Sequence, residues 1–330
     1  MNQSNPLPKI SVTIPALNEE ANLSALFEGF RNQTIPREDF EVIIVDNGSC
    51  DRTREIVQDE TGIANYRLRL LAEDKKGVGY ARRKGMNDAA ERGIRYLAGT
   101  DADSSVPPTW IADILNMFEK TGADCLFGSG EWDLSGFASR PDLQETFKEA
   151  LMVRLALSKH VMMRPRGVNF AITKEMYEKI GGMPQPADET GKSRPGEDVQ
   201  LSKLVEQHDG KIATIGCVVK TSPRRLMQAL LNNTPNHYYA DDTDMRNEAD
   251  LYKAVLAIDL EKAQDFFDAT IKRVFGDSIL SKINTEAWEK AKQFVAPREK
   301  EFVQDAATMG IDEIYAKYKA LFISNAKSLQ

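Results

Sequence analysis

The sequence is poor in cysteine and has no long apolar run. Its three cysteines, Cys50, Cys125 and Cys217, lie far apart and are odd in number, which argues against a disulfide framework or a zinc cluster and favours reduced thiols. No run approaches the roughly 18 apolar residues of a membrane span, and the first residues, MNQSNPLPK, lack the apolar core of a signal peptide. We therefore expect a cytoplasmic protein, and peripheral attachment to a membrane stays open.

Positive charge is not in excess either. The chain has 43 Lys and Arg residues against 50 Asp and Glu residues, which gives a formal net charge of −7 at pH 7. This balance gives no reason to expect a nucleic acid as partner. The 330 residues suffice for a sizeable core and about two domains, and they contain no internal repeat or low-complexity segment.

The first two thirds of the chain alternate strand and helix patterns. Between the apolar runs lie amphipathic stretches such as Leu23–Phe30 and Trp110–Phe118, whose apolar residues share one face. Strand alternating with helix predicts a mostly parallel sheet that helices cover on both faces. The runs that we interpret as strands are Ile10–Ile14, Val42–Val45, Arg67–Ala72, Ile94–Ala98, Cys125–Gly128, Ile212–Ile215 and Cys217–Val219.

From about Leu226 onward the pattern is almost wholly helical. We therefore place a domain boundary near residue 225, with an α/β domain over residues 1–225 and a helical C-terminal extension over residues 226–330. The apolar stripes of this extension must be buried against something. We expect them to pack back on the α/β domain, with a homodimer as the alternative because symmetric dimers are common.

Two carboxylates, Asp101 and Asp103, follow a predicted buried strand directly. Mg²⁺ takes oxygen ligands and is commonly shared with substrate phosphates. Ligands of α/β sheets gather at the carboxyl ends of the strands. The same edge should collect the loops Pro15–Glu20 and Asp46–Asp51 and the Gly-rich start of a helix, Gly77–Gly85, whose free amides favour anions. Taken one by one, Asn18 reads as the cap of the next helix, Asp46 as a turn residue and residues 82–84 as a solvated helix face. Together they favour a nucleotide diphosphate bound with a metal.

The residues at this edge resemble the family 2 glycosyltransferases, which have the GT-A fold, over roughly residues 9–225. The Asp-Asp-Gly-Ser-x-Asp signature of the family is matched by Asp46–Asp51, with Asn47 in place of the second Asp. Its Ala-Arg-Asn-x-Gly segment is matched by Ala81–Gly85, with Arg83 in place of the Asn. The resemblance implies that Asp46 binds the nucleobase. The donor-binding residues that it implies are Pro15, Asn18, Glu19, Asp46, Gly79, Arg82, Asp101 and Arg225.

The resemblance also implies the metal, acceptor and catalytic residues. Asp101 and Asp103 match the Asp-x-Asp of the family, and Asp103 is the metal ligand by analogy. Glu197 and Asp198 match the base motif, in which the Asp takes the proton of the acceptor hydroxyl. A helix N-cap is the other reading of Asp198. Leu204 replaces an Arg that is usual in this helix. The residues that match the acceptor-side strand and the Gly-Gly turn are Gly167, Asn169 and Gly182.

Three features further along the chain are open to two readings. Arg224 and Arg225 follow helix-start residues and suit phosphate, although a capped helix start alone explains them equally well. His237 would complete the metal shell, as a late His does in some GT-A enzymes, but a lone His is usually structural. The third feature is more typical of a solvated loop than of a second metal site, and it comprises Asp241, Asp242 and Asp244.

The sequence therefore predicts a GT-A glycosyltransferase that inverts the anomeric centre. Its expected donor is a nucleotide-diphosphate sugar, its acceptor is the hydroxyl of a glycan, a lipid-linked compound or a small molecule, and its cofactor is Mn²⁺ or Mg²⁺. Two alternatives stay open: a retaining GT-A synthase of a small glycoside of the glyceric acid type, and a non-catalytic scaffold that binds sugar nucleotides. Nucleotidyl transfer is disfavoured because residues 15–18 replace the Gly-rich signature that it needs after the first strand.

Overall fold

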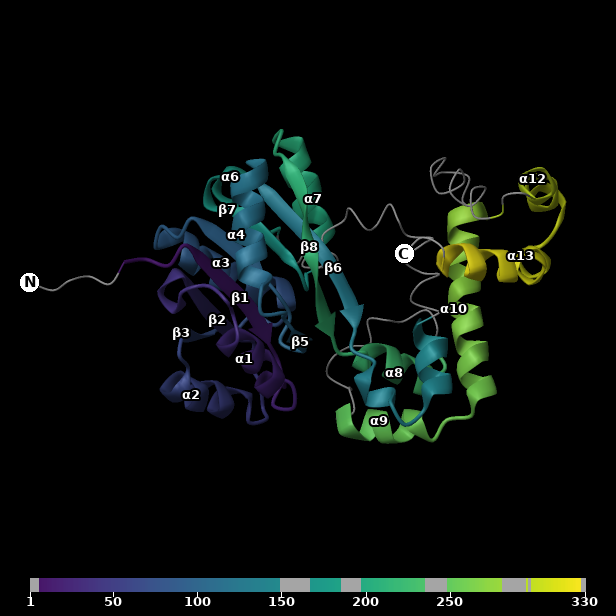
Figure 1. Cartoon of the computed structure of the whole chain (residues 1–330), viewed down its shortest axis with the longest axis horizontal. Coiled ribbons are helices and arrows are strands. Elements are labelled where there is room, and N and C mark those ends of the chain that lie inside the picture. Colours follow the sequence, from purple (N-terminus) through teal and green to yellow (C-terminus); the bar gives the residue numbers. More distant parts are fainter. Residues whose placement is uncertain are drawn as a thin grey trace, which may run out of the picture. The chain divides into compact units, whose positions relative to one another are not determined.

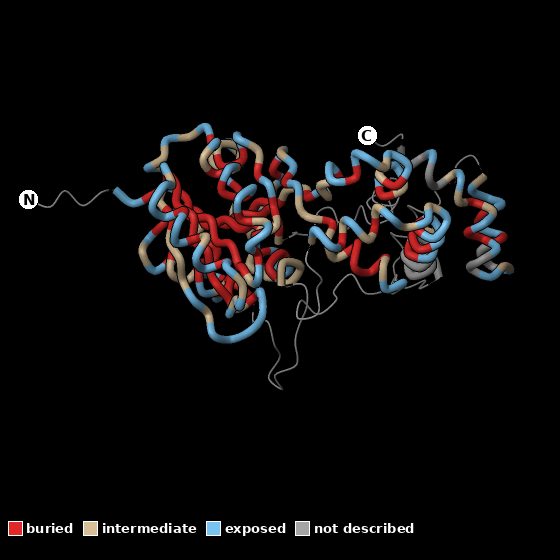
Figure 2. The backbone as a smooth tube through the Cα atoms, turned by 90° about the horizontal axis from the view of Figure 1, so that it is seen from below, coloured by how far each residue is buried: buried red, intermediate tan, exposed pale blue. Residues whose placement is uncertain are grey.

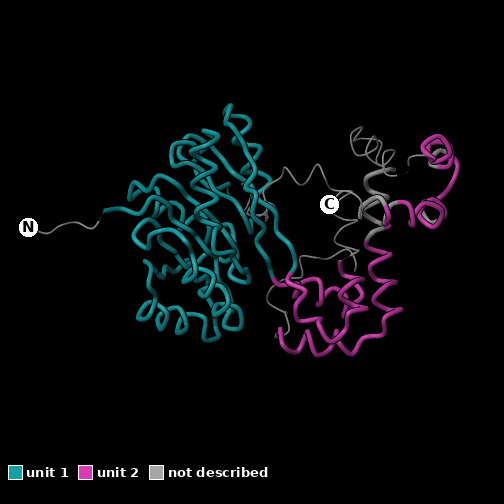
Figure 3. Tube along the Cα trace, in the orientation of Figure 1, with its two compact units in different colours: residues 1–132, 163–221 teal, residues 133–162, 222–330 magenta. Residues whose placement is uncertain are grey.

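The computed structural model describes residues 6–148, 167–184, 197–234, 248–280, 295 and 298–327. The chain forms two compact units (Figure 3). The first unit comprises residues 1–132 and 163–221, and the second comprises residues 133–162 and 222–330. Residues 133–162 thus group with the C-terminal part of the chain. The domain boundary near residue 225 and the packing of the extension stay predictions.

Eight strands of the first unit form one sheet in the order β3-β2-β1-β4-β7-β6-β8-β5 (Figure 1). All pairings are parallel except β4 with β7, β7 with β6, and β8 with β5. Six strands therefore point the same way, as a mostly parallel sheet requires. The strands are β1 Ile10–Ala16, β2 Phe40–Asp46, β3 Arg67–Ala72, β4 Tyr96–Gly99, β5 Ser104–Ser105, β6 Cys125–Trp132, β7 Phe170–Thr173 and β8 Ile212–Thr221.

The central strands β1 and β2 are buried along their whole length, and Figure 2 shows them within a continuous buried layer. Val42 and Ile44 face one core cluster, which includes Trp110, and Ile43 and Val45 face a second. Helices cover both faces, as predicted. Those that contribute to the first cluster are α1 Leu23–Arg31, α2 Thr53–Ile63 and α4 Trp110–Thr121. Those that contribute to the second are α3 Val78–Glu91, α6 Lys174–Lys179 and α7 Glu197–Gln207.

Two local predictions are wrong. The runs interpreted as two strands after residue 211 form one strand, β8, with a bulge. Gly128 pairs with Ile215 and Ser129 with Val218, so Gly216 and Cys217 are extra residues of the bulge. The other error concerns the cap of helix α1: the helix begins at Leu23, and its N-cap position is occupied by Asn22 rather than Asn18.

The second unit is helical in its described part. Phe137 stacks near Phe147, with ring centroids 4.7 Å apart, and near Tyr252, at 5.2 Å. Arg140 donates to the carbonyl of Leu256 at 2.8 Å, so the segment after residue 132 packs with α9. Within the described residues no helix has the length and apolar character needed to cross a bilayer. The helices are α8 Arg224–Leu231, α9 Glu248–Leu256, α10 Leu260–Leu280, α12 Glu299–Thr308 and α13 Ile311–Lys327, and short 3₁₀ helices span η1 Arg37–Asp39 and η2 Ser135–Phe137.

Helix α3 lies close to the sheet at Gly85. A Cβ atom at Gly85 would stand 2.5 Å from Cγ2 of Thr13 and 3.0 Å from Cγ2 of Val45, both on buried strands. At Gly62, on the exposed face of α2, a Cβ atom would meet nothing within 4 Å. Alanine at Gly62 would change only the helix propensity, whereas alanine at Gly85 would also change the packing against the sheet.

We expect Gly85→Ala to lower the free energy of unfolding by about 1 kcal/mol. Overpacking costs about 1–3 kcal/mol, and the gain of roughly 1 kcal/mol from Ala over Gly in a helix offsets only part of it. Gly62→Ala, as the matched control, should be neutral or stabilising. Urea denaturation of both variants measures the difference, and an equal gain in stability for both would contradict the close packing of α3.

Candidate active site

The loops that follow β1 and β2 are tied together by hydrogen bonds. The amide of Asn18 donates to Oγ of Ser49 at 3.0 Å, and its side-chain Oδ1 accepts from the amide of Cys50 at 2.9 Å. The amide of Glu19 donates to Oγ1 of Thr53 at 2.7 Å. Asn18 adopts the left-handed backbone conformation, with φ of 56°, which aims its side chain at the neighbouring loop. The two predicted donor-binding loops thus form one structural element.

Asp46 ends β2 between these loops and is 1% exposed. Its Oδ1 accepts the amide of Ser49 at 3.2 Å, and its Oδ2 lies 3.7 Å from Nε of Arg54. In the sheet it pairs with Ala16 of β1 and Ala72 of β3, next to the buried Pro15. Arg54 was not singled out in the sequence, because only the fold brings helix α2 back to this carboxylate.

Asn47 anchors the loop before helix α3. Its side-chain Nδ2 donates to the carbonyls of Glu73 at 2.8 Å and Lys75 at 2.7 Å, and its Oδ1 accepts from the backbone amide of Gly77 at 2.7 Å. An ionised Asp can only accept hydrogen bonds, so it could not make the first two contacts. Asn47, which replaces the second Asp of the family signature, therefore fixes the loop before α3 in this chain. Gly79, predicted to bind the donor, is buried in the first turn of α3.

Arg82 joins two predicted motifs. Its guanidinium pairs with Asp101 and with Glu197, and it lies 5.9 Å from the centre of the Phe170 ring. Only 3% of the residue is exposed. Burial alone would lower the pKa of Arg82, but the charges of Asp101 and Glu197 raise it above its ordinary value. The guanidinium is thus charged and links the strand β4 loop to helix α7.

Gly167 leaves room for this guanidinium. A Cβ atom at Gly167 would stand 2.4 Å from Nη2 of Arg82. The amide of Gly167 also donates to Oδ2 of Asp198 at 3.1 Å. Gly167, predicted to contact the acceptor, therefore lies between Arg82 and the predicted base.

Asp198 lies in the first turn of α7, which begins at Glu197, so it is inside the helix rather than at its N-cap. Its Oδ1 accepts the amide of Val199 at 2.7 Å. Burial, and then the charge of Glu197, raise the pKa of Asp198 above its ordinary value. A carboxylate with a raised pKa is a stronger proton acceptor than a solvated one. Leu204 packs against the second core cluster where the family usually has an Arg.

The carboxylate pair after β4 is held from two sides. Oγ1 of Thr221, the last residue of β8, donates to Oδ1 of Asp103 at 3.1 Å, and Asp101 is held by Arg82. No group of three or more His, Cys, Asp or Glu side chains among the described residues could hold a metal. Mg²⁺ commonly uses only one or two carboxylates and takes its other ligands from water and substrate phosphates. The two carboxylates fit that mode of binding.

Asn169, predicted to contact the acceptor, is fully buried. Its Oδ1 accepts from Nε1 of Trp110 at 2.9 Å, and its side-chain Nδ2 donates to the carbonyls of Ser129 and Cys217, each at 3.1 Å. Cys217 belongs to the bulge of β8, where the extra residues leave the strand ladder. Asn169 therefore has a packing role, and its contact with an acceptor stays a prediction.

The Gly-Gly turn after α6 is fixed by Arg83. Gly181 and Gly182 have positive φ values of 79° and 87°, which favour glycine. Arg83 donates to the carbonyls of Gly181, at 3.1 Å, and of Met183. The residue that departs from the Ala-Arg-Asn-x-Gly segment thus connects α3 to the turn that carries Gly182.

The remaining predicted site residues belong to the second unit or fall outside the described residues. Arg225 is the second residue of α8 in the second unit, so its role at the donor stays a prediction. Helix α8 begins at Arg224, so the reading of Arg224 and Arg225 as the start of a helix agrees with the structure. His237, Asp241, Asp242 and Asp244 fall outside the described residues.

Comparison with known proteins identifies relatives that match about half of the chain. The chain is 29% identical to the glycosyltransferase AglE of Haloferax volcanii, over 54% of this chain and 57% of that protein. It is 31% identical to a dolichol-phosphate mannosyltransferase of Pyrococcus furiosus, over 52% of this chain and 48% of that protein. The chain thus spans about half the length of the curated relatives it matches.

A solved structure of similar fold is the mannosyltransferase PcManGT of Pyrobaculum calidifontis, in complex with GDP-Man and Mn²⁺. The likeness covers 98% of this chain and 84% of that one, with a TM-score of 0.51 and 16% identity, and it confirms the predicted GT-A fold. The model of the family described as "Glycosyl transferase family 2" matches residues 11–181, more than half of the chain. The chain belongs to glycosyl transferase family 2.

Proposed function

We propose that this chain is an inverting glycosyltransferase, which moves a sugar from a nucleotide-diphosphate sugar to an acceptor hydroxyl with Asp198 as the general base. One observation carries the proposal: the buried guanidinium of Arg82 contacts both Asp101 and Glu197. The Asp-x-Asp motif and the Glu-Asp motif are far apart in the sequence and meet at this one side chain. Donor and base must be held close together for transfer, and this pairing gives that proximity a physical basis.

On the donor side, Asp46 would accept a hydrogen bond from the nucleobase, within the element formed by the loops of Pro15, Asn18 and Glu19. Asp103 and Asp101, with His237, would hold Mn²⁺ or Mg²⁺. A divalent ion bound there would act as a Lewis acid that stabilises charge on the leaving diphosphate. Further positive charge at the diphosphate would come from Arg225.

On the acceptor side, Asp198 would take the proton of the attacking hydroxyl. The acceptor oxygen then forms a bond to the anomeric carbon while the bond from that carbon to the phosphate oxygen breaks, and the nucleoside diphosphate leaves with the electron pair. A base opposite the leaving group gives inversion by a single displacement. The raised pKa of Asp198 supports this role more than that of a scaffold residue, because a binding module has no need of a proton acceptor.

The carboxylate of Asp103 can be tested by binding. We expect Asp103→Ala to abolish the part of nucleoside diphosphate binding that depends on Mn²⁺, because the variant loses one of two carboxylates. Calorimetric titration with UDP and GDP, with and without Mn²⁺, measures this. Asp59→Ala, on the exposed face of α2, is the control. Equal metal-dependent affinity in Asp103→Ala and the wild type would remove Asp103 from the site.

Removing the base should separate binding from transfer. Asp198→Asn keeps the size of the side chain but cannot take a proton, so transfer should fall roughly a hundredfold or more while donor affinity is kept. Release of nucleoside diphosphate from a panel of nucleotide sugars and acceptors gives the rate, and NMR of the product gives its anomeric configuration. Glu206→Gln, exposed on the same helix, should leave the rate unchanged. Transfer near the wild-type rate in Asp198→Asn, or a product with retained configuration, would overturn the mechanism.

The pH dependence of transfer should report the same group. Burial and Glu197 raise the pKa of Asp198 above its ordinary value of 3.8, and only the ionised form accepts a proton. The kcat/KM for transfer should therefore fall as the pH drops through the raised pKa, with the midpoint above pH 3.8. A pH profile, with circular dichroism recorded at each pH, measures the midpoint. The residual activity of Asp198→Asn should lack this decline, and a decline kept in the variant would assign it to another group.

A further inference from the structure

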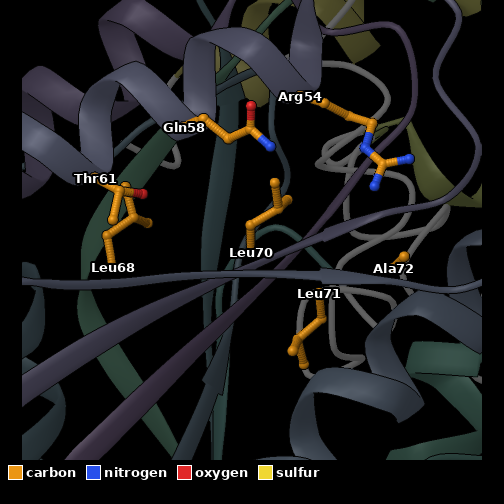
Figure 4. A pocket seen from close by; sticks show the side chains of 7 residues that line it. All are labelled: Arg54, Gln58, Thr61, Leu68, Leu70, Leu71 and Ala72. Atoms are coloured by element: carbon orange, nitrogen blue, oxygen red, sulfur yellow. The ribbon is translucent and has the colours of Figure 1, made fainter.

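A pocket lies between helix α2 and the edge strand β3, and its residues come from these two elements alone (Figure 4). The side chains from α2 are polar and those from β3 are apolar. Arg54, Gln58 and Thr61 follow one another at helical spacing, so one face of α2 turns toward the pocket. The lining residues from β3 are Leu68, Leu70, Leu71 and Ala72.

Two residues that line the pocket neighbour Asp46, which is not itself among the lining residues. Ala72 is the sheet partner of Asp46, and Arg54 forms an ion pair with its carboxylate. The Arg54 side chain is 54% exposed, whereas that of Asp46 is 1% exposed. The guanidinium therefore covers the Oδ2 side of a carboxylate that solvent barely reaches.

The contact between these two groups is an ion pair without a hydrogen bond. Nε of Arg54 stands 3.7 Å from Oδ2 of Asp46, beyond hydrogen-bond distance. Oδ1 is engaged by the amide of Ser49 at 3.2 Å. A guanidinium carries five N–H donors in a rigid plane, and this ion pair is the one interaction of Arg54 within the described part of the chain. Among the described residues Oδ2 of Asp46 accepts no hydrogen bond, and the donors of the Arg54 guanidinium lie beside it.

We propose that Arg54 and Asp46 together recognise the nucleobase of the donor. This proposal rests on the function proposed above. Oδ2 of Asp46 would accept an N–H of the base, and the guanidinium of Arg54 would donate to the neighbouring oxygen or nitrogen acceptor on the same edge. The pairing edges of bases carry such a donor beside an acceptor, and proteins read these edges by hydrogen bonds. Arg suits this task because its planar fork loses little freedom when it binds.

A neighbouring arginine provides the contrast. Arg52 precedes α2 in the same loop, its side chain is 69% exposed, and it pairs with Glu55 at 3.4 Å. It does not line the pocket. Each arginine therefore places one positive charge near the loop, but only Arg54 lies beside Asp46.

The test compares Arg54→Met with Arg52→Met, because each removes one charge and keeps an unbranched stem. Calorimetry measures the affinity for three probes: UDP, GDP and ribose 5-diphosphate, which has no base. Arg54→Met should weaken whichever nucleoside diphosphate the wild type binds by about tenfold to a hundredfold, the size of a lost hydrogen bond to a charged group. It should leave ribose 5-diphosphate unaffected, and Arg52→Met should leave all three unaffected.

Other results would overturn the inference in distinguishable ways. Unchanged or tighter nucleotide binding in Arg54→Met would show that the side chain only covers Asp46. An equal loss for ribose 5-diphosphate would assign Arg54 to the phosphates, and an equal loss in Arg52→Met would reduce the effect to overall charge. If the wild type binds neither UDP nor GDP, with or without Mn²⁺, the proposed function itself fails. Urea denaturation of both variants checks that the fold is kept.

Discussion

The arrangement of the candidate site depends on one buried charge, the guanidinium of Arg82. Taking a guanidinium out of water is costly unless opposite charges and hydrogen bonds compensate for it. Here Asp101 and Glu197 provide that compensation from two separate segments of the chain. If either carboxylate moved away, the buried guanidinium would lose one of its two charge partners. The loop after β4 and the start of α7 are therefore held at a fixed separation, which is what a transfer reaction between two substrates needs.

The same guanidinium also enters the electrostatics of the proposed base. Burial and the charge of Glu197 raise the pKa of Asp198, while the charge of Arg82 and the hydrogen bonds from the backbone lower it. The net result is a raised pKa of Asp198, and the charge of Arg82 limits the size of the increase. The carboxylate is thus more basic than a solvated Asp, and the nearby positive charge still favours its ionised form. Glu197 therefore has two effects: it forms an ion pair with Arg82, and its charge raises the pKa of Asp198.

The sequence predicts those parts of the structure that depend on local pattern. Strands β1 and β2 are recognisable because each contains a short run rich in apolar and β-branched residues, ISVTI in β1 and VIIV in β2. The bulge of β8 is not recognisable in the local pattern, because the carbonyl of Cys217, one of the extra residues there, is bonded by Asn169, a residue distant in the sequence. The pairing of Arg54 with Asp46 likewise needs the fold. Departures from a family signature proved informative: Asn47 and Arg83 each make backbone contacts that the family residue, Asp or Asn, could not make in the same way.

The first of these departures connects the proposed nucleobase loop to the helix that carries Arg82. Asn47, next to Asp46, accepts the amide of Gly77, which stands at the N-cap of α3. Arg82 lies in the second turn of that helix, and Arg83 beside it holds the Gly-Gly turn. A continuous series of hydrogen bonds and one rigid helix thus runs from the loop of Asp46 to Asp101 and Glu197. Because each link is short and directional, the position of the proposed catalytic base, Asp198, relative to the proposed nucleobase loop would be set before any substrate arrives, and the ordering cost of binding would be correspondingly smaller.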